Sequence, residues 1–205
     1  MPPAKKKTSV SNARGANPPK AAGKAKPVAT QKPPLAAPPK KAPSAAATES
    51  ADLVGQPAPD FTLPNQDGAP VALKSLLERG DLVLYFYPKD MTPGCTVEAC
   101  GFRDAVEEIH ALGAEIAGVS ADPPTAHRKF IDKHGLNFPL LSDPDNRVTK
   151  AYGVYKKKSL YGREYMGIER TTFIIGRGGM VRTVFPKVKV SGHTGEVLAA
   201  LKPPP

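Results

Sequence analysis

The segment 82-LVLYFYPKDMTPGCTVEAC-100 joins the pattern of a buried strand to the start of a helix. Residues 82–87 form a continuous apolar and aromatic run that ends at Pro88, which is typical of a strand covered on both faces. Thr92 and Pro93 are residue types favoured at the N-cap and at the first position of a helix. A buried strand that leads through a short loop into a helix indicates an α/β fold.

The flanking sequence extends this pattern. After Thr92, apolar residues recur every three or four positions, as expected of a helix with one buried face. The other predicted elements are a hairpin with arms at 60–63 and 71–73, a strand at 116–120, a helix at 123–134, a second hairpin with arms at 171–175 and 180–185, and a helix at 195–202. We therefore predict an α/β sandwich with a mixed central sheet flanked by helices.

Residues 1–50 differ from the rest of the chain in composition. They contain ten Pro and thirteen Ala, with ten of the 29 basic residues but only one of the 19 acidic ones. Such a segment buries too little apolar surface to offset its loss of conformational entropy. We predict a disordered basic tail at residues 1–50 and one folded domain at residues 51–205, which carries a net charge of only +1.

No apolar run approaches the roughly 18–20 residues that a membrane-spanning helix needs, and the tail lacks the apolar core of a secretory signal. The sequence therefore predicts a soluble cytoplasmic protein with no membrane partner. Lys5-Lys6-Lys7 offers the alternative of a nuclear address if the source is eukaryotic.

Cys95 and Cys100 are the only cysteines of the chain. Two cysteines are too few for a disulfide scaffold in a chain of 205 residues, so a close pair is expected to be catalytic, metal-binding or redox-sensing. A structural zinc site needs four ligands, and the four histidines show no ligand spacing. We therefore predict a thiol site without a metal.

The predicted helix start determines the position of Cys95 within the helix. It would be the third helical residue, with its backbone N–H capped by the Thr92 hydroxyl, and the helix dipole would favour its thiolate form. Gly94 leaves room beside the sulfur for a small polar reactant. The alternative is that Cys95 is a small buried apolar residue.

The spacing of the two cysteines constrains how Cys100 can act. On a regular helix their Cα atoms would be about 8.6 Å apart, whereas a disulfide needs less than about 7 Å. Either the two sulfurs never meet, or the helix unwinds locally so that Cys100 can bond to Cys95. A third reading is that Cys100 only fills the core.

The segment 85-YFYPKDMTPGCTVEACGFRD-104 resembles the active-site segment of the peroxiredoxins, and within them the bacterioferritin comigratory protein or peroxiredoxin Q group. Pro88, Thr92 and Cys95 match the family motif Pro-x-x-x-Thr-x-x-Cys, and Cys100 matches the second cysteine of the group. The segments 139-PLLSDPDNRVTKAYGV-154 and 164-EYMGIERTTFII-175 are also similar to the group, and the second places Arg170 at the family's active-site arginine. The similarity covers residues 53–202, and Met91 departs from the group's usual acidic or small polar residue.

The resemblance implies a thioredoxin-like fold and thiol-dependent reduction of hydrogen peroxide and alkyl hydroperoxides, without a cofactor. It implies that Cys95 becomes a sulfenic acid while Thr92 and Arg170 hold the peroxide in a pocket with Pro88 and Gly94. Cys100 would then close a disulfide that thioredoxin or a similar dithiol reduces. By the same resemblance the protein is expected to be a monomer.

Other polar residues receive plainer interpretations. Glu98 either orients Arg170 or faces solvent. The run Lys156-Lys157-Lys158 is expected in a solvated loop, with partner binding as the alternative. The histidines are expected to be dispensable for the chemistry, because a stabilised thiolate needs no general base.

Two rival functions remain. A thiol-disulfide oxidoreductase would share the fold, but its usual Cys-x-x-Cys motif is absent. A nucleic-acid-binding protein would act through residues 1–50, whose net charge of +9 favours weak, salt-sensitive, sequence-independent contact. That segment has no aromatic residue for stacking on bases.

Overall fold

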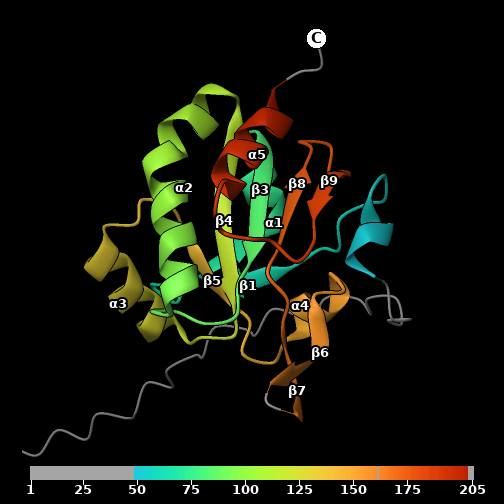
Figure 1. Cartoon of the computed structure of the whole chain (residues 1–205). Coiled ribbons are helices and arrows are strands. Elements are labelled where there is room, and N and C mark those ends of the chain that lie inside the picture. Colours follow the sequence, from blue (N-terminus) through green and yellow to red (C-terminus); the bar gives the residue numbers. More distant parts are fainter. Residues whose placement is uncertain (1–48, 161, 203–205) are drawn as a thin grey trace, which may run out of the picture. The chain divides into compact units, whose positions relative to one another are not determined.

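The computed structural model describes residues 49–160 and 162–202 (Figure 1). The predictions of disorder and of nucleic-acid contact concern residues 1–50, of which residues 1–48 lie outside the described part of the chain. Within it, a 3₁₀ helix, η1 (Ser50–Leu53), opens the chain, and Ser50 is 1% exposed. The domain therefore begins to pack at the last residue that the sequence assigned to the tail.

A five-stranded mixed sheet forms the centre of the domain, in the order β5-β4-β3-β8-β9. Its middle strand β3 (Asp81–Phe86) is parallel to β4 (Ala114–Ser120) and antiparallel to β8 (Thr171–Ile175). The outer strands are β5 (Leu140–Ser142), parallel to β4, and β9 (Val181–Phe185), antiparallel to β8. The predicted mixed sheet and thioredoxin-like fold are confirmed.

Helices cover both faces of the sheet, so β3 is buried on both sides, as its apolar run predicts. Its residues Val83 and Tyr85 pack with α2 (Pro93–Ala111), α3 (Pro124–His134) and α5 (His193–Leu201). The alternate residues Leu82, Leu84 and Phe86 pack with the short helices α1 (Leu73–Leu77) and α4 (Arg147–Ala151). No helix in residues 49–160 and 162–202 is long and apolar enough to cross a membrane.

Helix α2 is held against α5 at its middle. The Phe102 ring is fully buried, 5.0 Å from the Tyr85 ring and 5.7 Å from that of His193 between centroids. At Gly101, a Cβ atom would lie 2.8 Å from Thr194 Oγ1, so glycine permits this close approach of the two helices. Helix α2 is thus anchored at Gly101 and Phe102, directly after the first turns, which carry the cysteines.

Two hairpins lie outside the main sheet. The predicted first hairpin is β1 (Thr62–Pro64) with β2 (Pro70–Ala72). The second, β6 (Tyr155–Leu160) with β7 (Arg163–Ile168), corrects the prediction of a solvated loop at 156–158. Those lysines form a strand because β6 pairs with β7 along its length, and Lys158 Nζ in addition donates to the Ile168 carbonyl at 2.6 Å.

Candidate active site

The turn from β3 into α2 positions Cys95. Thr92 occupies the N-cap with extended backbone, Pro93 is the first helical residue, and Cys95 follows in the first turn at 2% exposure. Cys100 lies on the same continuous helix, is partly exposed, and both thiols are free. Pro88, in the loop after β3, is exposed. The folded helix therefore separates the two sulfurs, as the sequence spacing implied.

The Thr92 side chain departs from its predicted role as a cap. Its hydroxyl donates to the Lys89 carbonyl at 3.1 Å, and within the described residues it makes no cap hydrogen bond to the first turn. The loop before the helix bends back, so the Lys89 carbonyl accepts the hydrogen bond of the hydroxyl. The Thr92 oxygen keeps lone pairs that can accept a hydrogen bond, and the Cys95 N–H, as a first-turn donor, has no intrahelical acceptor.

Arg170, which links β7 to β8, bridges Cys95 and Glu98. Its Nη2 donates to Cys95 Sγ at 3.2 Å, and its Nη1 forms an ion pair with Glu98 Oε2. The Glu98 side chain is 1% exposed, so the prediction that Glu98 orients Arg170 is confirmed and the solvent-facing alternative is wrong. A Cβ atom at Gly94 would lie 3.4 Å from Arg170 Nη2. Glycine thus keeps the space beside the guanidinium open.

Glu98 is an unusual carboxyl group. Burial raises its pKa from 4.5 to about 7, and the charge and hydrogen bond of Arg170 offset that effect only in part. Its second oxygen, Oε1, is buried and has no hydrogen-bond partner among the described residues. The carboxyl can therefore gain or lose a proton near neutral pH.

This pKa predicts a pH-dependent stability. The folded state holds the Glu98 proton up to about pH 7, whereas the unfolded chain releases it near 4.5, so folding loses free energy as pH rises between these values. From about pH 5 to about pH 8 the loss should be about 2 to 3 kcal/mol. Urea unfolding of wild type and Glu98→Gln should show that the variant lacks this loss. Parallel pH curves would contradict the raised pKa.

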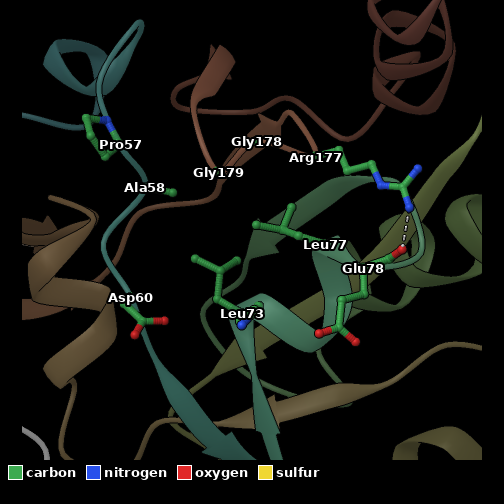
Figure 2. A pocket seen from close by; sticks show the side chains of 10 residues that line it. Pro57, Ala58, Asp60, Leu73, Leu77, Glu78, Arg177, Gly178 and Gly179 are labelled. Carbon is green, nitrogen blue, oxygen red and sulfur yellow. Dashed lines mark hydrogen bonds between the residues drawn. The ribbon is translucent and has the colours of Figure 1, made fainter.

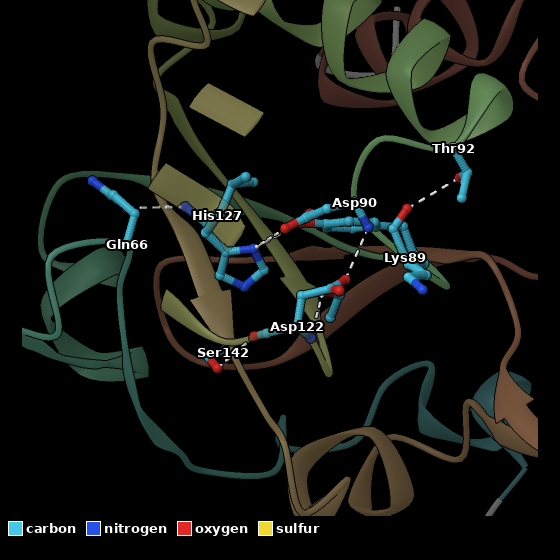
Figure 3. A network of polar contacts seen from close by, with 10 residues as sticks. Gln66, Lys89, Asp90, Thr92, Asp122, His127 and Ser142 are labelled. Carbon is cyan, nitrogen blue, oxygen red and sulfur yellow. Dashed lines mark hydrogen bonds and ion pairs between the residues drawn. The ribbon is translucent and has the colours of Figure 1, made fainter. Parts of the chain in front are cut away.

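A buried polar network that the sequence analysis missed fixes the loop before α2 (Figure 3). Asp90, 5% exposed, accepts from the Tyr87 hydroxyl at 2.7 Å and contacts His127 Nδ1 at 2.8 Å. Its backbone N–H donates to the Asp122 carboxylate at 2.8 Å. Between this anchor and Thr92, Met91 adopts a left-handed backbone with φ of 60°. The network thus fixes the loop conformation that places Thr92 at the start of α2.

A separate surface groove lies between α1 and the turn from β8 to β9 (Figure 2). Leu73 and Leu77 contribute apolar side chains to it, and Arg177 Nη2 donates to the Glu78 carbonyl at 3.0 Å beside it. None of the predicted site residues lines this groove. Within the described part of the chain, no group of three or more His, Cys, Asp or Glu residues is placed to hold a metal ion.

Comparisons with known proteins agree with the geometry around Cys95. The model of the AhpC/TSA family matches residues 54–184. Peroxiredoxin Bcp of Bacillus subtilis is 48% identical over 149 residues, which cover 73% of this chain and 94% of that protein. A structure of Xanthomonas campestris peroxiredoxin Q has a TM-score of 0.65 at 43% identity, covering 69% of this chain and 89% of that one.

A second Xanthomonas campestris structure, described in terms of the alkyl peroxide reduction activity of bacterioferritin comigratory protein, has a TM-score of 0.65 at 42% identity. It covers 69% of this chain and 89% of its own. The chain therefore belongs to the AhpC/TSA family and, within it, to the Bcp or Q group of peroxiredoxins, which are thiol-dependent peroxidases.

Proposed function

We propose that this peroxidase reduces hydrogen peroxide and alkyl hydroperoxides through a Cys95 sulfenic acid and a Cys95–Cys100 disulfide, which thioredoxin or a similar dithiol reduces. The observation that carries the proposal is the 3.2 Å contact between Arg170 Nη2 and Cys95 Sγ at a buried helix start. The relative described by its alkyl peroxide reduction activity supports the substrate class.

In the first step the Cys95 thiolate attacks one peroxide oxygen. A sulfur–oxygen bond forms, the O–O bond breaks, and its electron pair leaves on the second oxygen. Arg170, the first-turn N–H groups and the Thr92 oxygen are available to hold the two oxygens. Donors fixed before the reaction stabilise the charge that develops on the leaving oxygen.

In the second step the Cys100 sulfur attacks the sulfenic sulfur of Cys95, and water leaves as the disulfide forms. The Cα separation of about 8.6 Å on a regular helix exceeds the limit of about 7 Å for a disulfide. The first turns of α2 must therefore unwind before Cys100 reacts. An external dithiol then reduces the disulfide by thiol exchange, and the helix can form again.

Mass spectrometry after one equivalent of peroxide tests this sequence of steps. Wild type should carry the 95–100 disulfide, whereas Cys100→Ser should stop at a Cys95 sulfenic acid.

Arg170→Met should slow the first oxidation by on the order of 10²-fold or more, because one donor to the leaving oxygen is lost.

Arg103→Met is the matched control, since Arg103 lies on α2 but bonds Asp104 at 2.7 Å and the His134 carbonyl at 2.6 Å, and neither of these residues contacts Cys95. It should oxidise at the wild-type rate. Reduction by a thioredoxin system then tests the recycling step separately. A wild-type product in which Cys100 remains a free thiol would overturn the proposed disulfide.

A further inference from the structure

Cys95 and Glu98 share one cation. They lie three residues apart on α2, a spacing that places side chains on one helix face, and both contact the Arg170 guanidinium. The Glu98 side chain is 1% exposed and Cys95 is 2% exposed. One buried positive charge can fully compensate one negative charge but not two.

Among the described residues, no second cation contacts Glu98. Lys158 of β6, whose pKa is lowered by burial, interacts electrostatically with Cys95 and Arg170, but its Nζ donates to the Ile168 carbonyl. Arg170 approaches from the β7–β8 link and Cys95 from α2 itself. From β3 comes Tyr85, whose pKa is raised well above its ordinary value by burial and then by the negative charge of Glu98, so this phenol stays neutral. When Cys95 is a thiolate, the cluster is therefore most stable with Glu98 protonated.

We propose that Glu98 is the proton reservoir of the peroxidase reaction. It takes up a proton when Cys95 ionises and returns one when the peroxide bond breaks. This inference rests on the proposed function, and it assigns to Glu98 a second role besides orienting Arg170. The unpartnered Oε1 is the oxygen that can carry the proton, because Oε2 is engaged by Arg170.

The step balances in atoms, charge and electrons. The Cys95 thiolate, a hydroperoxide ROOH and protonated Glu98 give the sulfenic acid, the alcohol ROH and the Glu98 carboxylate. The sulfur loses two electrons and the peroxide gains them, while the Glu98 proton neutralises the leaving alkoxide. The thiolate charge disappears as the carboxylate charge appears, so the net charge beside Arg170 stays constant throughout.

Leaving-group chemistry separates proton donation from positioning. An alkyl hydroperoxide releases a strongly basic alkoxide, which needs a proton, whereas peracetic acid releases acetate, which does not. At about pH 6, Glu98→Gln should slow Cys95 oxidation by cumene hydroperoxide on the order of 10²-fold, the usual scale of acid catalysis. It should slow oxidation by peracetic acid only a few-fold. Glu107→Gln, an exposed change on the same helix, should alter neither rate.

If Glu98 only positions Arg170, Glu98→Gln should slow the reactions with both oxidants equally, and that result would overturn the proposal.

If Glu98→Gln fails to fold, wild type provides the test through a series of alkyl hydroperoxides whose alcohols differ in acidity. The rate should depend little on that acidity below about pH 7 and clearly above it, because Glu98 loses its proton there. Because the hydroperoxides are compared at one pH, the fraction of Cys95 present as thiolate is the same for all of them and does not affect the comparison. A dependence that does not change with pH would overturn the proposal, whereas no oxidation of wild type by either oxidant would overturn the proposed function itself.

Discussion

Cys95→Ser is expected to reduce peroxidase turnover to background. Serine keeps the shape of the side chain but supplies no thiolate, and removal of an enzymatic nucleophile can cost on the order of 10⁴-fold or more. Cys100 cannot take over, because it lies five positions further along α2 and Arg170 contacts the sulfur of Cys95. The measurement is peroxide consumption with a dithiol reductant, with circular dichroism to confirm that the variant is folded.

Cys100→Ser is the matched control, since it makes the same atomic change on the same helix. It should still consume one equivalent of peroxide in a single turnover, whereas Cys95→Ser should consume none. Turnover of Cys95→Ser near the wild-type rate would remove Cys95 from the mechanism.

Oxidation to the disulfide is expected to expose the backbone amides of residues 94–104. Closing the 95–100 bond requires unwinding of the first turns of α2, and those turns include residues next to the Phe102 contact with Tyr85 and His193. Hydrogen exchange there should become faster by on the order of 10²-fold or more, because the exchanging amides no longer need a rare opening event. Residues 82–86 should stay protected, since β3 is paired with strands on both sides.

Cys100→Ser treated with one equivalent of peroxide is the control for oxidation without a disulfide. Its helix should keep the protection of the reduced protein. The unwinding mechanism fails if exchange is unchanged in wild type that mass spectrometry shows to carry the 95–100 disulfide.

Local patterns in the sequence predict much of this fold. The apolar run at 82–87, the three-and-four spacing after Thr92 and the turn residues of two hairpins each depend on neighbours along the chain, and each element forms as predicted. The strand at 156–158 was missed because its partners lie across the hairpin and its polar side chains resemble those of a loop.

The candidate site likewise combines residues that local sequence patterns predict with residues whose partners lie far away in the sequence. Thr92, Pro93 and Cys95 belong to one helix start, and the resemblance supplies Arg170, 75 residues away from Cys95. The contact of Asp90 with His127 spans 37 residues and follows no local rule. One signal was available, because His127 shares the apolar face of α3 with Phe130 and Ile131 and should therefore be buried. The partner of the Thr92 hydroxyl depends on loop geometry that the residue types do not specify.

The close packing of α2 on α5 at Gly101 and Phe102 affects how steeply the turnover rate depends on temperature. If the first turns of α2 melt in every catalytic cycle, the enthalpy of that melting enters the activation enthalpy of turnover. Cooling would then slow disulfide formation more steeply than the peroxide step, and sulfenic acid would accumulate in the cold. Substitutions that tighten the contact between the two helices would give a more heat-resistant protein that is a slower catalyst at low temperature.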